Sequence, residues 1–447
     1  DNPISNTLST QGIRINKLQA QVNTSPIEGM SSNACMTGFA TDSLSIDTIF
    51  FKSSQTTDGI VWKSGIQSSA QKNQEGFNIL VDGNIGSKES QITIEYLNDK
   101  KERGAYIGLI GALQDKGISL HIHPDNPILV YRPFQVNPDN YIYLSDEGRI
   151  HANLTLHDEN YTGIRFYSVA DSTVQQDLTV ELHRIRMSEF RRIIPYMPNI
   201  RGEINAEAHY VQADEENTQV STELSVAELE YDGFPMGDWE FSGVYLPKGS
   251  DEHHIDGFLI HNGDEIATLN GSYITQNEKD AEGLLQANMD LHHFPLKLAN
   301  AFVPDNMVTL SGDIDGNMAV KGTASKPILN GEIILDSVGL ALPMASMNLR
   351  FDNKPVKVVD SQLEFNKFNI FTKGKTPFTI DGNINFSDFE QMTMNLNMAA
   401  HNFELFNAPR SKEALVYGKL YVDFNSSLRG PVNALVMRGS MNVLGKR

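Results

Sequence analysis

The amino-acid sequence predicts an all-β protein, folded as an elongated, curled sheet of mainly antiparallel strands that forms an open, solenoid-like groove with a few short helices. Three observations lead to this prediction. Apolar and polar residues alternate along most of the chain, turn-forming stretches separate the alternating runs, and helical spacing of apolar residues is confined to three short segments. The stretch LSGDIDGNMAVKG at 310–322 shows the alternation clearly, and it predicts a strand with one apolar and one polar face.

Composition and charge restrict the expected partners. The chain has 447 residues, of which 40% are hydrophobic and 21% charged, as in folded proteins. Its net charge of −20, without a basic stripe, repels phosphate backbones and anionic lipid headgroups, so nucleic acid is not an expected partner. The single cysteine, Cys35, excludes an internal disulfide. There is no apolar run of about 18 residues and no signal peptide, so any membrane anchor is expected to lie outside this sequence.

The alternating runs follow one another from residue 77 to the C-terminal end. Turn-forming sequences such as DNKP and NSSLRGP stand between them. The intervening positions carry Asn, Thr, Ser, Asp and Lys, which favours antiparallel neighbours with a solvated outer face. Each run predicts one strand, in this order: 77–85, 92–96, 150–156, 178–182, 220–226, 239–245, 285–291, 310–320, 329–335, 347–351, 378–386, 392–398, 416–424 and 435–443.

The three helical segments mark an internal repeat. They cover 187–198, 294–304 and 403–415, and each precedes a strand centred on a glycine, at 202, 312 and 418. These glycines are 110 and 106 residues apart, and similar strands around residues 271 and 382 are 111 apart. A period of about 108 divides the chain into an N-terminal β-groove segment 1–175, a unit 176–286 with a helix at 187–195, a unit 287–392 with a helix at 295–302, and a truncated unit 393–447.

Two architectures fit such repeats. One is a string of β-sandwiches with self-packed cores, which suggests a structural or adhesive array; the other is a continuous sheet whose units join edge to edge. Alternation continues through 310–400 without the linkers that separate sandwiches need, which favours the continuous sheet. Such a sheet must twist and curl, and its apolar face then lines a groove.

Glycines interrupt the apolar face at the alternate strand positions that are expected to face the groove. We expect them either to permit coiling and leave space in the groove, or to mark bulges and bends of a closed core. They are Gly312, Gly316, Gly331, Gly382, Gly418 and Gly439.

The alternation also identifies the residues that are expected to line the groove. Several are methionines, whose flexible thioethers suit irregular apolar ligands as well as an ordinary core. The predicted lining residues are Ile314, Met318, Val320, Leu329, Ile333, Leu335, Met347, Leu349, Phe351, Phe378, Ile380, Ile384, Phe386, Met392, Met394, Leu396, Met398, Leu420, Val422, Phe424, Leu435, Met437, Met441 and Val443.

No catalytic, metal or cofactor site is predicted. The motif HIH at 121–123 and the pairs His292/His293 and Asp313/Asp315 are interpreted as solvated strand or turn residues. The motif KGKT at 373–376 lacks the first glycine of a phosphate loop, and no G-x-S-x-G motif is present. An enzyme acting on polysaccharide through carboxylates on a long β face is a third alternative. The stretch RRIIP at 191–195 is either a solvated helix face or a contact for a headgroup phosphate.

Residues 310–444 resemble the repeated unit of the TamB family of translocation and assembly module proteins, relatives of the AsmA-like group. The resemblance is carried by GDIDGNMAVKGTASKPILNGEIIL, LPMASMNLRF, VDSQLEFNKF and PFTIDGNINF, in the order that the family shows. It is looser over 175–310, and before residue 120 it rests on alternation and on VDGNIG.

The resemblance implies an open β-taco with an apolar interior, in the periplasm of a diderm bacterium and anchored in the inner membrane by an N-terminal segment. The implied function is outer-membrane biogenesis. It would proceed through transport of phospholipid acyl chains, or through protein translocation and assembly with a TamA-type outer-membrane barrel. The sequence lacks the anchor and ends at NVLGKR, where the family continues, so we expect an internal fragment. No enzymatic activity is implied.

Overall fold

The structure is a computed structural model that describes residues 13–26, 29–41, 44–70, 75–170, 173–192, 194, 197–214, 217–249, 251–275, 282–303, 308–343, 347–388, 390–408 and 418–444. These residues contain 29 strands, which belong to one antiparallel sheet. The predicted all-β class and antiparallel sheet are therefore confirmed. The chain divides into two compact units, the first comprising 1–214 and 224–233 and the second 215–223 and 234–447.

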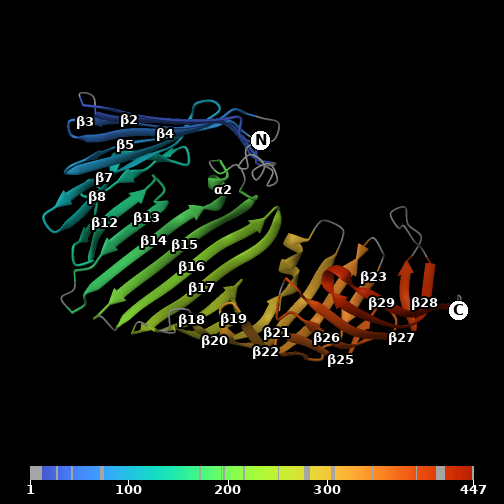
Figure 1. Cartoon of the computed structure of the whole chain (residues 1–447). Helices are drawn as coiled ribbons and strands as arrows, with labels where there is room; N and C mark the ends of the chain where they lie inside the picture. The colour runs from blue at the N-terminus through green and yellow to red at the C-terminus, as the bar shows by residue number, and fades with distance from the viewer. Residues whose placement is uncertain are drawn as a thin grey trace. The chain divides into compact units, whose positions relative to one another are not determined.

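In the first unit the strands follow one another in chain order (Figure 1). Each of β1 to β8 pairs with the next, β11 pairs with β8, and β11 to β15 continue the series. The short strands β9 and β10 pair with β8 and β12. The bounds are β1 (Lys17–Ser25), β2 (Gly29–Ala40), β3 (Ser45–Thr56), β4 (Gly59–Ser68), β5 (Phe77–Gly86), β6 (Glu89–Asn98), β7 (Arg103–Gln114), β8 (Gly117–Leu129), β9 (Arg132–Pro133), β10 (Gln135–Val136), β11 (Tyr141–Ser145), β12 (Ile150–His157), β13 (Gly163–Ser168), β14 (Gln176–Arg186) and β15 (Ile200–Gln212).

The second unit contains longer strands, several of 14 to 16 residues. The long strand β22 pairs with two short ones, β23 near one end and β24 nearer the other. β16 (Thr218–Tyr231) is divided between the units. The other bounds are β17 (Phe234–Lys248), β18 (Glu252–His261), β19 (Asp264–Ile274), β20 (Leu284–Pro295), β21 (Thr309–Thr323), β22 (Pro327–Leu342), β23 (Met347–Phe351), β24 (Val356–Val359), β25 (Gln362–Phe371), β26 (Phe378–Asn385), β27 (Thr393–Ala408), β28 (Gly418–Pro431), the 3-10 helix η3 (Val432–Ala434) and β29 (Val436–Leu444).

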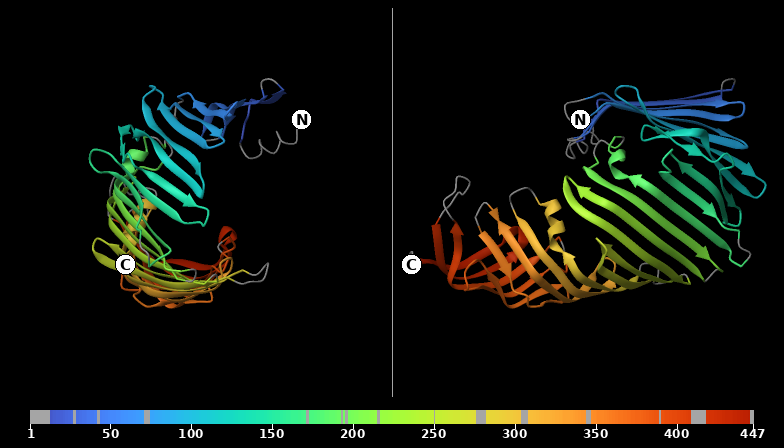
Figure 2. Two further views of the ribbon diagram at one scale, coloured as in Figure 1. Left: turned by 90° about the vertical axis from the view of Figure 1, so that its left-hand side faces the viewer. Right: turned by 180° about the vertical axis from the view of Figure 1, so that it is seen from behind.

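Strand pairing in the second unit is unbroken from β17 to β29. The β19–β20 pair joins residues 267–274 to 284–291, and the β26–β27 pair joins 378–385 to 393–400. Both pairs cross positions where one sequence repeat ends and the next begins. This unit is therefore a continuous sheet rather than a string of sandwiches, and Figure 2 shows that its strands form a curved layer.

Short helices connect neighbouring strands at the strand ends (Figure 1). α2 (Met187–Phe190) lies between β14 and β15, and the 3-10 helix η1 (Leu296–Phe302) lies between β20 and β21. The first two predicted helices are present, the first of them shorter than predicted. The third prediction, 403–415, is wrong over Phe403–Ala408, because paired residues of β28 draw this segment into β27. Its remaining residues lie outside the described part of the chain.

β-Bulges recur at the period of the sequence repeat. The pairing of β14, β20 and β27 with the following strand shifts register near Arg184, His293 and Asn402. These residues are 109 positions apart, and their φ angles are 51°, 49° and 47°. Each donates its backbone N–H to a side-chain oxygen of the next strand, at 2.8–2.9 Å, which satisfies a donor that the bulge removes from the ladder. The acceptors are Asn205, Asp315 and Asp423.

The inward glycines are explained by the backbone. At Gly331, for example, φ is 156°, and a Cβ would lie 2.0 Å from the carbonyl oxygen of Asn317 on the neighbouring strand. Similar contacts, all below 2.7 Å, would form at four further positions, whereas a Cβ at Gly418 would meet nothing within 4 Å. The close approach of strands, rather than open space in a groove, accounts for these glycines. The four positions are Gly312, Gly316, Gly382 and Gly439.

Buried apolar residues are arranged differently in the two units. In the first, Phe134 and Val136 pack with Leu154 and Leu156 of β12 as a compact cluster, which Ile107, Ile122 and Phe166 extend. In the second, the buried residues are distributed along one face of the sheet. This face contains the positions that alternation selected as a candidate binding surface.

Candidate functional site

The second unit carries a continuous apolar face. We define it as the side of the sheet that bears Ile314, Met318 and Val320 on β21, together with the strand residues in register with them. Directly opposed residues of antiparallel strands point to the same side, so the pairing identifies the members. One row across the sheet reads Leu269, Met289, Met318, Gly331, Val358, Leu363, Ile384, Met394 and Gly430.

Each predicted lining residue that lies in a strand falls on this apolar face. Ile314 is opposite Leu335, Phe351 is opposite Ile370, and Val422 is opposite Val443, so positions far apart in the sequence share one side. Three predicted residues lie just outside the strands, where the ladder gives way to turns. Phe386 follows β26, Met392 precedes β27, and Leu435 follows η3.

Sequence alternation missed several well-buried members of the apolar face. Val356 and Val358 belong to the short strand β24, and Phe368 and Phe403 follow bulges. A bulge shifts the inward parity by one, so Phe365 and Phe368 face the same side although one number is odd and the other even. The signal that could have identified them is a pair of apolar residues separated by two polar ones, as in FNKF and AHNF.

Aromatic rings strengthen the C-terminal part of the apolar face. The centroid of the Phe378 ring lies 5.5 Å from that of Phe424 and 5.8 Å from that of Phe403. Phe368 similarly lies 5.7 Å from Phe365 and 6.3 Å from Phe351. Rings at such separations pack laterally, so each strand is held to its neighbours by side chains as well as by the backbone ladder.

The apolar face is covered only in part. Met318, Leu396, Met398 and Val422 are between 2% and 8% exposed, whereas most other members are half-buried. On the edge strand β29, three members are 56–60% exposed. A sheet side that packed against a second layer would bury most of its residues. The exposed members are Met437, Met441 and Val443.

Few elements of the second unit fold back onto the sheet in the described part of the chain. Apart from β23 with β27, its strands make their main contacts with the strands beside them. The helix η1 contacts β21 and β17, and its Leu298 is 5% exposed. η1 therefore covers one portion of the sheet and leaves the rest to be shielded by curvature and lateral packing.

One polar group is buried within the apolar face. Ser426 lies opposite Met398 and Gly439 and is 6% exposed. Its hydroxyl has no hydrogen-bond partner among the residues that the structure describes. A buried hydroxyl without a partner costs free energy.

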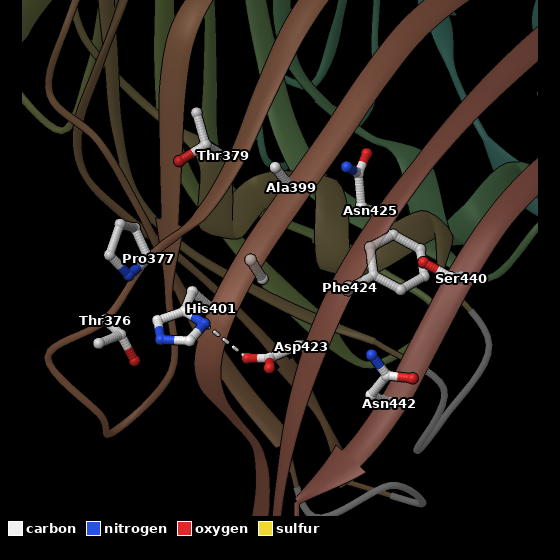
Figure 3. A pocket seen from close by; sticks show the side chains of 11 residues that line it. Thr376, Pro377, Thr379, Ala399, His401, Asp423, Phe424, Asn425, Ser440 and Asn442 are labelled. Carbon is white, nitrogen blue, oxygen red and sulfur yellow. Dashed lines mark ion pairs between the residues drawn. The ribbon is translucent and has the colours of Figure 1, made fainter.

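The polar face of the same sheet bears a separate hollow of about 580 Å³ at the bulge of β27 (Figure 3). His401 Nδ1 lies 2.8 Å from Asp423 Oδ1, and Thr379, Asn425 and Asn442 add further polar groups around it. Nearby, the buried Glu404 accepts a hydrogen bond of 2.8 Å from the Tyr421 hydroxyl, which raises the pKa of that phenol. Pro377, Ala399 and Phe424 supply apolar walls, so the hollow is of mixed character.

The remaining sequence candidates have local explanations. His121 bonds to the carbonyl oxygen of Asn140 and to the Ser119 hydroxyl, and His123 bonds to Gln91. KGKT at 373–376 lies between two strands and does not open a helix. Among the described residues, no helix has the length and hydrophobicity needed to cross a membrane.

Comparison of the chain with protein-family models, with curated proteins and with solved structures finds no match.

Proposed function

We propose that this chain is the periplasmic β-groove of a TamB-like protein and that the apolar face of its second unit receives phospholipid acyl chains. In this proposal the protein supports outer-membrane biogenesis by carrying lipid between the inner and outer membranes. As an alternative or additional role, it aids protein translocation and assembly with a TamA-type barrel as partner. The proposal rests on one observation: apolar residues remain in register across consecutive strands from β20 to β29, and they are buried or half-buried up to β28 and exposed on β29.

The energetics favour an acyl chain as the occupant. Apolar area removed from water contributes roughly 25 cal/mol per Å², so a chain of about sixteen carbons gains on the order of 10 kcal/mol when fully sheltered. A half-buried face can supply part of that gain repeatedly along its length. The methionines on β21, β27 and β29 adapt their shape to a mobile hydrocarbon, which fits successive binding positions better than one rigid pocket.

The charge distribution agrees with this role. The net charge of −20 and the Asn-rich, Asp-rich outer positions keep the polar side in water and away from anionic membrane surfaces. Lipid would therefore bind through its tails, and the headgroup would remain outside the apolar face.

A charge placed on the apolar face tests the proposal. Leu349 and Asn348 are neighbours on β23, with Leu349 on the apolar face opposite Leu340 and Asn348 exposed on the other side. Leu349→Arg should weaken binding of a fluorescent acyl probe at least tenfold, because a bound hydrocarbon chain would remove water from an unpaired guanidinium. Asn348→Arg adds the same charge and should bind as the unaltered chain does.

Native mass spectrometry after mild extraction completes the experiment. We expect phospholipid to co-purify with the unaltered chain and with Asn348→Arg, and to be depleted from Leu349→Arg. Circular dichroism and thermal melting establish that the two variants are equally folded. Equal probe affinity in both variants, or a lipid-free unaltered chain that takes up no probe, would contradict lipid binding.

A further inference from the structure

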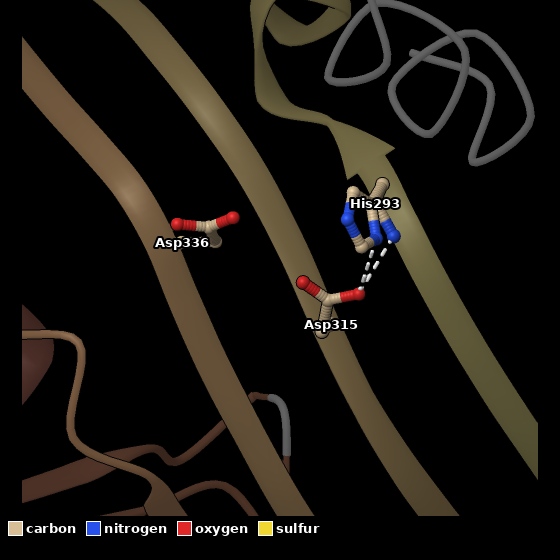
Figure 4. Close-up of side chains that lie close together, drawn as sticks. All are labelled: His293, Asp315 and Asp336. Atoms are coloured by element: carbon tan, nitrogen blue, oxygen red, sulfur yellow. Dashed lines mark hydrogen bonds and ion pairs between the residues drawn. The ribbon is translucent and has the colours of Figure 1, made fainter.

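Three side chains on the polar face of the second unit form a cluster of metal-ligand type. His293 lies at the bulge of β20, Asp315 on β21 and Asp336 on β22, so three consecutive strands contribute one residue each (Figure 4). One ligand atom from each residue lies within 4.8 Å of the others. The sequence gives no hint of this grouping, because 43 residues separate His293 from Asp336 and only the pairing of the strands brings them together.

The geometry fixes one carboxylate oxygen and leaves the other available. The backbone N–H of His293 donates to Asp315 Oδ1 at 2.8 Å, and its Nδ1 lies 2.9 Å from the same oxygen. The second oxygen of Asp315 is on the side of Asp336 (Figure 4). Ligand atoms around tetrahedral Zn²⁺ are about 3.3 Å apart, so closing the cluster requires only side-chain rotation. His293 can rotate, because its side chain is 75% exposed.

Negative charge accumulates at this point, where His293 pairs with Asp315 and Lys297 lines the same hollow as His293 and Asp313. Asp313 is directly opposite Asp336 in the strand register, and Asp315 is two residues along the same strand. Like charges in direct cross-strand opposition destabilise a sheet. In the described part of the chain, no lysine or arginine forms an ion pair with any of these three aspartates. A bound cation would remove this repulsion.

The first sequence repeat shows that the bulge does not require these residue types. There Arg184 occupies the position of His293, and its backbone N–H donates to Asn205 at 2.9 Å. Ser337 and Glu228 both have positive φ angles and are 109 residues apart, so they occupy equivalent positions in the two repeats. The residue before each is Asp336 in the second repeat and Ala227 in the first. An amide oxygen accepts the backbone N–H of the bulge as well as a carboxylate does. The bulge therefore does not explain the imidazole and the two carboxylates of the second repeat.

We propose that His293, Asp315 and Asp336 bind a divalent transition-metal cation of the Zn²⁺ kind. Mixed imidazole and carboxylate ligation suits Zn²⁺, whereas Ca²⁺ and Mg²⁺ take oxygen ligands alone. Three protein ligands leave a fourth position for water. The metal would join β20, β21 and β22 beside the bulge, at the point where η1 departs from the sheet. This proposal is independent of lipid binding, since the cluster lies on the polar face.

Calorimetric titration of the whole chain with Zn²⁺ tests the site. We expect one Zn²⁺ per chain, with binding to Ca²⁺ at least tenfold weaker. The chain itself suggests substitutions that preserve the fold: Asp315→Asn and His293→Arg reproduce the residues of the first repeat. Each should weaken Zn²⁺ binding at least tenfold while the circular dichroism spectrum is unchanged.

The third repeat supplies the matched control. Asp423→Asn makes the same change at the equivalent bulge, where Asp423 accepts the backbone N–H of Asn402 and pairs with His401. This variant should bind Zn²⁺ as the unaltered chain does. The melting temperature should rise with added Zn²⁺ in the unaltered chain and in Asp423→Asn, but not in Asp315→Asn. Absence of Zn²⁺ binding, or equal binding by Asp315→Asn and Asp423→Asn, would overturn the proposal.

Discussion

At the scale of single residues, polar groups are satisfied mainly across neighbouring strands. Glu181 in the first unit is an example: it is 8% exposed and pairs with Arg165 at 2.9 Å. The Tyr167 hydroxyl donates to its other oxygen at 2.9 Å, and His183 Nε2 lies 2.8 Å from the first. Burial alone would raise the pKa of the Glu181 carboxyl, but the hydrogen bonds from His183 and Tyr167 and the charge of Arg165 lower it overall.

This lowered pKa predicts a specific dependence of stability on pH. A carboxyl whose pKa is lower in the folded state stabilises the fold above its unfolded pKa, and the contribution disappears as pH falls through the folded pKa. The difference in unfolding free energy between the unaltered chain and Glu181→Gln should therefore be large at neutral pH and shrink as pH falls below about 4.5. Denaturant titrations across this range measure it. A difference that stays constant with pH would contradict the assigned role of the carboxylate.

At the scale of elements, glycines and bulges determine where strands approach closely and which side chains face inward. Sequence alternation predicted about half of the strands, because a period of two is readable from the residues alone. It missed β1 to β4, β7 to β11, β13, β18 and β25, and also β24, whose four residues are too few to show a pattern. It also assigned Phe403 to a helix, because the register shift between Glu404 and Phe406 goes with two phenylalanines three residues apart, a spacing that resembles a helical turn.

The backbone role of the inward glycines leads to a stability prediction. Gly316→Ala should lower the unfolding free energy by about 2 kcal/mol or more, since φ is unfavourable and the backbone is rigid. A Cβ there would lie 2.3 Å from the carbonyl oxygen of Glu332. Gly111→Ala is the matched control: its nearest contact is a flexible leucine methyl at 3.2 Å, and it should change stability by less than about 1 kcal/mol. Chemical denaturation compares the two, and equal losses would contradict the assignment.

At the scale of the whole molecule, two features were accessible from the sequence. The all-β antiparallel class followed from alternation, and the repeat was visible as glycine-centred strands near helical segments. The bulges at Arg184, His293 and Asn402 recur every 109 residues with similar φ angles, so the backbone conformation repeats as well. The cluster of His293, Asp315 and Asp336 was not accessible, because register between strands depends on turn lengths and bulges that alternation does not encode. The extent to which the apolar face is covered also could not be predicted from the sequence, because it depends on the three-dimensional arrangement of the strands.

Photo-crosslinking along β27 tests most directly whether the apolar face is open to hydrocarbon. This strand alternates cleanly, with Met394 and Leu396 on the apolar face and Asn395 and Asn397 exposed on the other. Crosslinkers placed at these four positions and activated in the presence of phospholipid vesicles should yield lipid adducts at the first two and not at the second two. Equal yields on both sides, or adducts at the apolar positions that join only strands of the protein itself, would contradict an accessible apolar face.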